Sequence, residues 1–153
     1  MSSLLSALTG EVTPDFRVFV VAGVLDGQTV GSAVEGEREP PAGRIAAGHD
    51  GLIIRTAYRP YWEMVHNRFE RWDGPPPVDD WEELWTGRLT LTSGLIGAEA
   101  WAAESSHDME FDLGQGDTTW STRVATKVLR TEHEPDFPDA IARIELYKIQ
   151  FWT

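Results

Sequence analysis

The sequence contains no cysteine, so it can form neither a disulfide framework nor a thiolate-based catalytic or metal site. No apolar run approaches the roughly 20 residues that a membrane-spanning helix needs. Basic residues are scarce, because 13 lysines and arginines stand against 25 aspartates and glutamates, giving a formal net charge of −12. Since affinity for nucleic acid comes largely from neutralising phosphates, direct nucleic-acid binding is not expected.

Residues 1–9 lack the basic region and the long apolar stretch of a signal peptide. A cytoplasmic protein without membrane attachment is therefore the expectation. The 153 residues suffice for a single domain, residues 1–153, with a real core, and residues 1–10 are left open as a disordered end. Seven tryptophans are a heavy load that can dominate a core or mark a binding face.

Alternation of apolar and polar residues is the main signal of secondary structure. Residues 85–93 place their apolar side chains on one parity and threonine and arginine on the other, as in an antiparallel strand with one solvated face. Residues 144–152 alternate too and are rich in β-branched and aromatic residues, so they are predicted to form a closing strand. Residues 15–25 are apolar on both parities, which indicates a strand buried on both faces, and Asp26-Gly27 offers a hairpin turn after it.

Other stretches are less regular. Residues 61–72 fit both helical spacing and alternation, and the flanking strands favour a strand. The Gly-Pro-Pro-Pro sequence after Asp73 predicts a stiff extended connector, after which Asp79 or Asp80 is placed to cap a single helical turn. Residues 35–48 are expected to form a surface loop. About eight short strands without helix–strand alternation predict an all-β fold, an antiparallel β-sandwich with a jelly-roll-like arrangement.

The second half of the sequence has a recognisable order of motifs. A Trp-Glu-Glu-Leu segment precedes an alternating strand, a glycine-rich turn precedes a strand with Arg-Val, and an aromatic strand ends the chain; these motifs are residues 81–84, Ser93-Gly94, Gly114, Gly116, Arg123-Val124, Glu145, Tyr147 and residues 149–152. In this order, residues 78–152 resemble small, mostly uncharacterised actinobacterial β-sandwich proteins. They also resemble the competence protein J family, the inhibitor subunit of a bacterial DNA-entry nuclease.

This resemblance implies a β-sandwich and a non-enzymatic inhibitor, and it carries over no set of functional residues. One departure is that the chain has Thr-Trp-Ser-Thr-Arg-Val over residues 119–124, where Gly-Tyr-x-Val-Arg-Val is expected.

No catalytic or metal-binding motif is present. The sequence has no HExxH motif, no P-loop and no EF-hand loop, and the 25 acids supply many accidental carboxylate pairs. The nearest metal-like grouping is His107 with its acidic neighbours, and a solvated acidic loop explains it better. Residues 112–117 lack the ligand spacing and the closing glutamate of a calcium loop. No catalytic residue, metal or cofactor is therefore expected.

The strongest candidate for a docking surface is the segment 99–117, which carries six acids and no lysine or arginine. An aromatic anchor inside an acidic rim has the composition of a protein-binding hot spot. A merely solvated sheet edge is the alternative. The candidate partner-binding residues are Trp101, Glu104, Asp108, Glu110, Asp112 and Trp81.

The first functional hypothesis is a protein-binding β-sandwich that inhibits a basic nuclease or toxin, with carboxylates occupying the space of substrate phosphates. The second is a small-ligand module that binds carbohydrate through exposed tryptophans. The third is an assembly subunit whose edge strands pair between chains. The sequence leaves the oligomeric state open.

Overall fold

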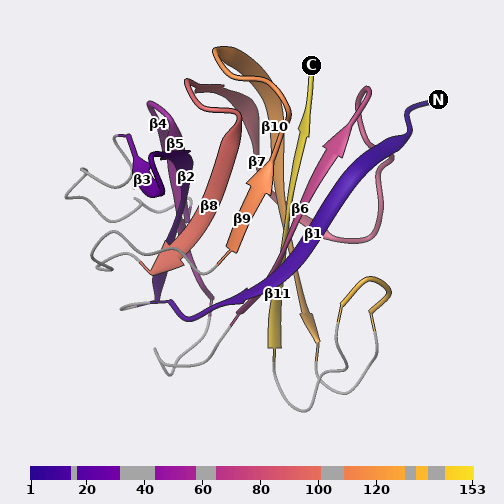
Figure 1. Ribbon diagram of the computed structural model, residues 1–153. Coiled ribbons are helices and arrows are strands. Elements are labelled where there is room, and N and C mark those ends of the chain that lie inside the picture. Colours follow the sequence, from indigo (N-terminus) through magenta and orange to yellow (C-terminus); the bar gives the residue numbers. More distant parts are fainter. Residues whose placement is uncertain (15–16, 32–43, 58–64, 101–108, 130–133, 138–143) are drawn as a thin grey trace.

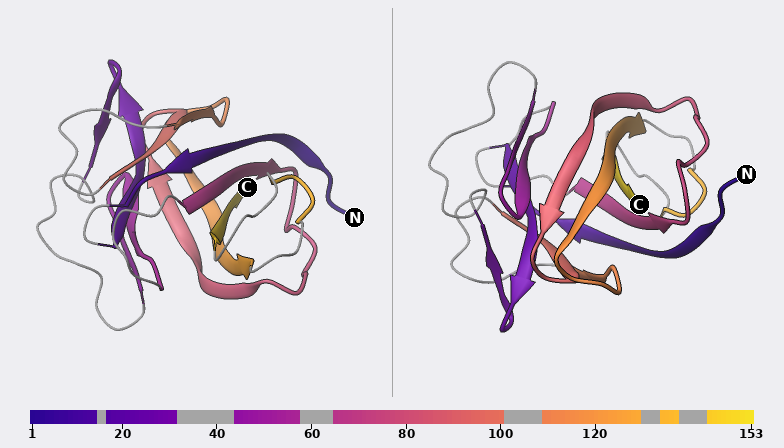
Figure 2. Two further views of the ribbon diagram at one scale, coloured as in Figure 1. Left: turned by 90° about the horizontal axis from the view of Figure 1, so that it is seen from below. Right: turned by 90° about the horizontal axis from the view of Figure 1, so that it is seen from above.

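The computed structural model describes residues 1–14, 17–31, 44–57, 65–100, 109–129, 134–137 and 144–153. Within these residues the regular secondary structure consists of strands alone, and they form two sheets that pack face to face (Figure 1, Figure 2). The predicted all-β sandwich is thereby confirmed. None of the described residues belongs to a helix that is long and apolar enough to cross a membrane.

The five-stranded sheet has the order β1-β6-β11-β10-β7. Its strands are β1 (Leu4–Val12), β6 (Val65–Trp72), β11 (Ile144–Trp152), β10 (Thr118–Leu129) and β7 (Glu82–Leu91). The six-stranded sheet has the order β4-β5-β2-β8-β9, and β3 pairs with β2. Its strands are β4 (Ile45–Gly48), β5 (Gly51–Arg55), β2 (Val18–Leu25), β8 (Leu95–Ala100), β9 (Met109–Asp112) and β3 (Gln28–Val30).

Several strand predictions are confirmed. Residues 65–72 of the ambiguous stretch form β6, and the closing strand is β11. Asp26 and Gly27, both with positive φ, turn β2 into β3 as the hairpin signal indicates. All residues of β2 before Leu25 are buried, and on the face away from the main core Val18, Val20 and Ile53 form a second small cluster.

One pairing departs from the fully antiparallel arrangement. Strands β6 and β11 run parallel, with Phe69 beside Ile149, whereas every other described pair is antiparallel. A parallel pair needs a long crossover, and here the chain passes through β7 to β10 between the two strands. The described residues contain eleven strands rather than about eight. The short strand β4 and the edge strand β1 were not expected, because they carry little alternation.

Three expectations are corrected. Residues 1–10 lie largely within β1, which pairs with β6 along its length; its outer edge leaves most side chains exposed, so no alternation marks it. The expected loop at 35–48 ends in strand β4, which forms a hairpin with β5. Asp79 caps no helical turn: its carboxylate accepts the Trp81 N–H at 3.0 Å, and the chain then enters β7 at Glu82.

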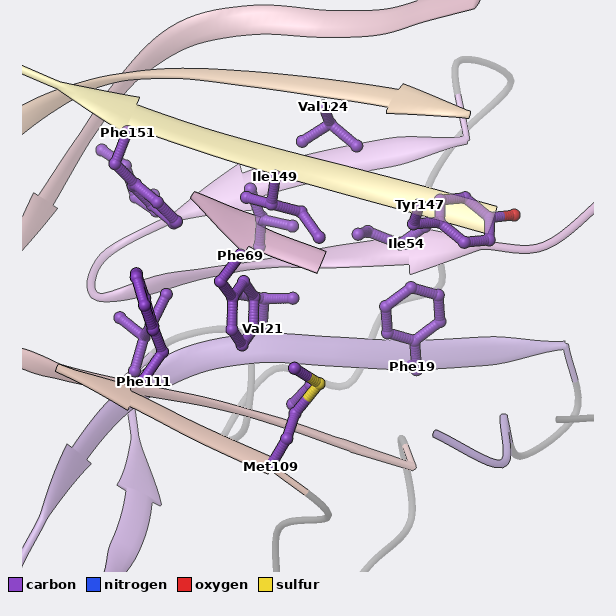
Figure 3. Packing of buried hydrophobic residues seen from close by; sticks show 14 of the residues in the cluster. Phe19, Val21, Ile54, Phe69, Met109, Phe111, Val124, Tyr147, Ile149 and Phe151 are labelled. Carbon is purple, nitrogen blue, oxygen red and sulfur yellow. The ribbon is translucent and has the colours of Figure 1, made fainter. Parts of the chain in front are cut away.

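The core lies between the two sheets. Phe19 and Val21 from β2 and Met109 and Phe111 from β9 face side chains of β6 and β11 (Figure 3). Phe69 stacks on Phe111 of the opposite sheet, with ring centroids 5.8 Å apart. The alternating pattern of β11 explains its place, since the parity of Tyr147, Ile149 and Phe151 is fully buried.

Asn67 is an exception in this core. Its side chain is fully buried on the inner face of β6 between Val65 and Phe69, and neither amide atom has a hydrogen-bond partner within the described part of the chain. A buried amide without a partner costs about 1–3 kcal/mol. We therefore expect Asn67→Leu, which keeps the side-chain volume, to raise the free energy of unfolding by about 1–2 kcal/mol. Urea unfolding of the variant and the wild type measures the difference in free energy. A variant less stable than the wild type would contradict the claim that the buried amide costs stability.

Candidate functional site

Charge is distributed unevenly between the surface and the interior. Among the described basic side chains only Arg88 is exposed, and the others are half-buried. Many acidic side chains are exposed: Glu11, Asp26, Asp73, Asp79, Asp80, Glu82, Glu83, Glu110, Asp112, Asp117 and Asp136. Many acidic side chains therefore face solvent, while most of the described lysines and arginines are partly covered by other residues.

Many of these exposed acids gather on one side of the molecule. The connector after β6 and the turn at 134–137 both lie on the outer face of the five-stranded sheet, away from the six-stranded sheet (Figure 1, Figure 2). We call residues 73–83 together with residues 134–137 the acidic layer. Its acids are Asp73, Asp79, Asp80, Glu82, Glu83, Glu134 and Asp136.

Basic side chains of the sheet beneath hold the acidic layer in place. Lys148 on β11 binds Asp79 at 2.7 Å, and Lys127 on β10 binds Glu134 at 2.8 Å and Asp80 at 3.3 Å. The hydrogen bond to Glu134 raises the pKa of Lys127 above its ordinary value. Burial acts to raise the pKa of Asp79, but hydrogen bonds from Lys148 and the Trp81 N–H outweigh it and hold that pKa below its usual range. The Asp79 carboxylate is therefore ionised at neutral pH.

Trp81 is the apolar attachment of the same layer. Its side chain is only 8% exposed and packs on Phe137, Ala125 and Leu146. The indole N–H donates to Glu134 at 3.2 Å, and the Lys148 ammonium lies 4.2 Å from the ring centroid. Trp81 thus fastens the connector to the sheet, and its predicted part in partner binding stays a prediction.

A buried polar network underlies the layer. The carboxylate of Glu70, 4% exposed, accepts hydrogen bonds from Gln150 at 2.8 Å, Trp72 at 2.9 Å and Arg68 at 2.7 Å. Burial acts to raise the pKa of Glu70, but these three bonds and the charge of Lys148 outweigh it and lower that pKa. Gln150 in turn accepts from Arg123, which also donates to the Pro77 carbonyl at 3.0 Å. The network joins β6, β11 and β10 to the connector.

A pocket of about 270 Å³ opens between this network and the connector. Leu4 of β1 and Val78 of the connector form apolar walls, and Asp79 and Asp136 contribute carboxylates. Arg68 and Lys148 also line it, but both are already paired with acids. The pocket therefore combines apolar surface with acidic charge in the middle of the acidic layer.

Of the residues predicted from the sequence, Trp81 belongs to the acidic layer, and the other described candidates lie elsewhere. Glu110 and Asp112 are exposed on β9, at the edge of the six-stranded sheet, and the Asp112 carboxylate accepts the Gly114 N–H at 2.7 Å. Trp81 lies next to β7, at an edge of the other sheet. The remaining candidates, Trp101, Glu104 and Asp108, fall outside the described residues. The structure thus leaves Glu110 and Asp112 as an exposed acidic pair and does not join Trp81 to them on one sheet.

Sequence reasoning missed the acidic layer as a possible site. The signal was present as the dense acidic run at 79–83 and the alternating acids at 132, 134 and 136. The run at 79–83 and the acids at 132, 134 and 136 are about 50 residues apart, and no local pattern in the sequence predicts that they meet. Only the fold places both segments over the same sheet.

Two other kinds of site find little support among the described residues. No group of three or more histidine, aspartate and glutamate side chains there could hold a metal ion. The described tryptophans are buried or half-buried. A carbohydrate site built on exposed tryptophans would therefore depend on Trp62 and Trp101, which lie outside the described residues.

Comparison with known proteins places the fold. A crystal structure of ComJ from Bacillus subtilis, described as an inhibitor of the DNA-degrading activity of NucA, matches 100% of this chain and 98% of its own with a TM-score of 0.58. The two proteins share a fold. No protein-family model and no curated protein matches the sequence.

The sequence identity to ComJ is 12%, so the similarity concerns the fold alone. It confirms the predicted resemblance to the competence protein J family at that level and extends it from residues 78–152 to the whole chain. The resemblance to actinobacterial proteins stays a prediction.

Proposed function

We propose that this protein is a non-enzymatic binding protein that docks a basic protein partner on its acidic layer and inhibits it. The observation that carries the proposal is the separation of charge: the acids of the layer are exposed for the most part, and the bases that pair with some of them lie half-buried beneath, so that acids outnumber bases at the surface. Such a surface attracts basic proteins over long distances and speeds their encounter.

A DNA-degrading nuclease is the partner class that we favour. Nucleases that act on DNA need a positively charged groove for phosphates, and fixed carboxylates can occupy the same groove and block it. The shared fold with ComJ, an inhibitor of a nuclease, supports this choice. The shared fold also agrees with our proposal that this chain is not an enzyme.

A pair of charge-matched variants tests the proposal. In the first variant, Asp80, Glu82 and Glu83 become Asn, Gln and Gln; in the second, Asp108, Glu110 and Asp112 become Asn, Gln and Asn. We expect the wild-type protein to retain a basic nuclease from host lysate at low salt, lose it at high salt, and suppress its DNA cleavage. The first variant should bind about tenfold more slowly at low salt, because three steering charges are gone. The second should bind at the wild-type rate.

Stopped-flow association with the purified partner gives both rates. If the second variant alone binds slowly, the docking surface is the β9 edge predicted from the sequence and not the acidic layer. If neither does, electrostatic docking on these surfaces is excluded. If the captured protein cleaves DNA equally well with and without this protein, the inhibitory role fails.

A further inference from the structure

Strand β1 is an edge strand without charged protection. Within the described part of the chain it pairs only with β6, so its other edge presents unpaired backbone N–H and C=O groups. Its first seven residues, Leu4 to Gly10, contain no charged side chain. The protein as a whole has a formal net charge of −12.

The other described edges carry the usual protection against strand pairing. Glu82, Glu83 and Arg88 lie on β7, which also has an irregular register near Leu84. Glu110 and Asp112 are exposed on β9. Strand β4 is only four residues long. Charge, irregular register and shortness are the devices by which sheets avoid edge pairing. Strand β1 is nine residues long and carries no charge before Glu11, and its register with β6 is irregular only between Leu4 and Ser6.

Exposed apolar side chains gather on the same strand. Leu5 is 53% exposed, Leu4 41% and Leu8 36%, and Val78, 89% exposed, lines the same pocket as Leu4. The only other large apolar side chains exposed in the described residues are Met1, close to β1, and Leu25, at the end of β2. The edge therefore offers both backbone hydrogen bonds and an apolar contact surface.

Acids surround this apolar edge. Asp73 accepts the Ser3 N–H at 2.6 Å, and the Asp136 carbonyl accepts the Thr9 hydroxyl at 3.1 Å. Glu11 lies at the end of β1 with its side chain 49% exposed, and Asp79 lines the pocket with Leu4. An apolar centre within a charged rim is the usual composition of a protein interface.

From this arrangement we propose that an extended segment of the basic partner adds to the edge of β1 as a sixth strand of the five-stranded sheet. The inference deepens the proposed function and depends on it for the basic character of the partner. Main-chain hydrogen bonds along β1 hold the segment, Leu4, Leu5 and Leu8 contact its apolar side chains, and the acidic rim pairs with its lysines or arginines. A second copy of this chain fits the edge less well, because the two acidic rims would repel each other.

Model peptides test the edge without the natural partner. One probe is a seven-residue peptide of alternating lysine and valine; its counterpart alternates lysine and proline, which keeps the charge but lacks half of the N–H donors and disfavours a strand. At low salt we expect the valine peptide to bind at least tenfold more tightly by fluorescence anisotropy, and to protect the amides of β1 from hydrogen exchange. Equal binding of the two peptides, or protection confined to other strands, overturns the inference.

A leucine-to-glutamate substitution separates edge docking from simple charge attraction. Leu5→Glu adds a negative charge beside the rim, so attraction alone predicts tighter binding of the basic peptide, whereas strand addition predicts binding at least about fivefold weaker because apolar contact is lost. Leu25→Glu is the matched control, since Leu25 is 42% exposed at the end of β2 and its replacement adds the same charge. The control should bind as tightly as the wild type or slightly more so. Tighter binding by Leu5→Glu overturns the inference.

Two further results distinguish this inference from the proposed function. Suppose that Leu5→Glu still captures the partner while the variant at Asp80, Glu82 and Glu83 does not. This result supports docking on the acidic layer and contradicts strand addition at β1. If both variants capture it as the wild type does, the acidic layer is not the docking surface either. Sedimentation of the free wild-type protein as a dimer with β1 protected from exchange shows that a second copy covers the edge, and it also overturns the inference.

Discussion

Replacing Glu70 by glutamine is expected to lower the free energy of unfolding by about 3 kcal/mol, the lower end of the cost of breaking a buried ion pair. The glutamine keeps the size of the side chain and one oxygen for Trp72 and Gln150, but it turns an amide N–H toward Arg68, whose Nε now donates to the carboxylate at 2.7 Å. Among the described residues, Arg68 then keeps Thr9 at 3.2 Å and Asp136 at 3.8 Å. Urea unfolding followed by tryptophan fluorescence measures the loss.

The same substitution should change how stability depends on pH. The pKa of Glu70 in the folded protein is lowered, so the ionised carboxylate favours the folded state. Its contribution is complete above the ordinary glutamate pKa of about 4.3 and is lost as the pH falls from there through the lower folded value. The difference in stability between the wild type and Glu70→Gln is therefore expected to be constant near neutral pH and to shrink below about pH 4.3.

A double-mutant cycle with Arg68→Gln provides the control. Because Arg68 and Glu70 stabilise each other, the double variant should lose less stability than the sum of the two single losses. A Glu70→Gln protein within about 0.5 kcal/mol of the wild type at neutral pH, with an unchanged acid limb, would show that the network contributes little.

Replacing Phe69 by alanine is expected to cost about 3–5 kcal/mol, the range for removing a large aromatic side chain from a core. Phe69 is fully buried and joins the sheets, because its ring contacts Phe111 of β9 at 5.8 Å and Phe151 of β11 at 6.4 Å between centroids. Its removal leaves a cavity between two close-packed layers and also deprives Phe111 and Phe151 of an aromatic partner.

Urea unfolding at neutral pH tests this loss as well, with an unchanged slope against denaturant showing that the denatured state is the same. Val78→Ala is the matched control, because its side chain is 89% exposed and should change stability by less than about 0.5 kcal/mol. A loss below about 1 kcal/mol for Phe69→Ala would mean that the two sheets do not pack through this ring.

Much of the fold could be predicted from residue pattern. The alternation of β7, β10 and β11 and the double-sided apolar run of β2 identify these strands. Successive side chains of a strand point to opposite faces, so burial of one face selects apolar residues at every second position and burial of both faces selects them throughout. Strand β1 could not be found in this way. It buries Val12 at its end while most of its residues face solvent on both sides, so only its pairing with β6 makes it a strand.

The candidate site was less accessible to the same reasoning. The net charge and the acidic runs are visible in the sequence, and they favoured the segment 99–117, of which Glu110 and Asp112 are found exposed on β9. The acidic layer depends on pairs far apart in the chain, such as Asp79 with Lys148 and Asp80 with Lys127. A count of charges cannot show which acids are exposed and which bases lie beneath them.

The sequence by itself determined that this protein is an acidic β-sandwich, because composition and alternation are local properties that burial imposes on each strand. The tertiary structure alone decided that β6 and β11 run parallel, that the connector and the turn at 134–137 cover one sheet, and that β1 is left as an uncharged edge. These features arise from contacts between residues distant in the chain, and the physical chemistry of each residue taken alone does not specify its distant neighbours.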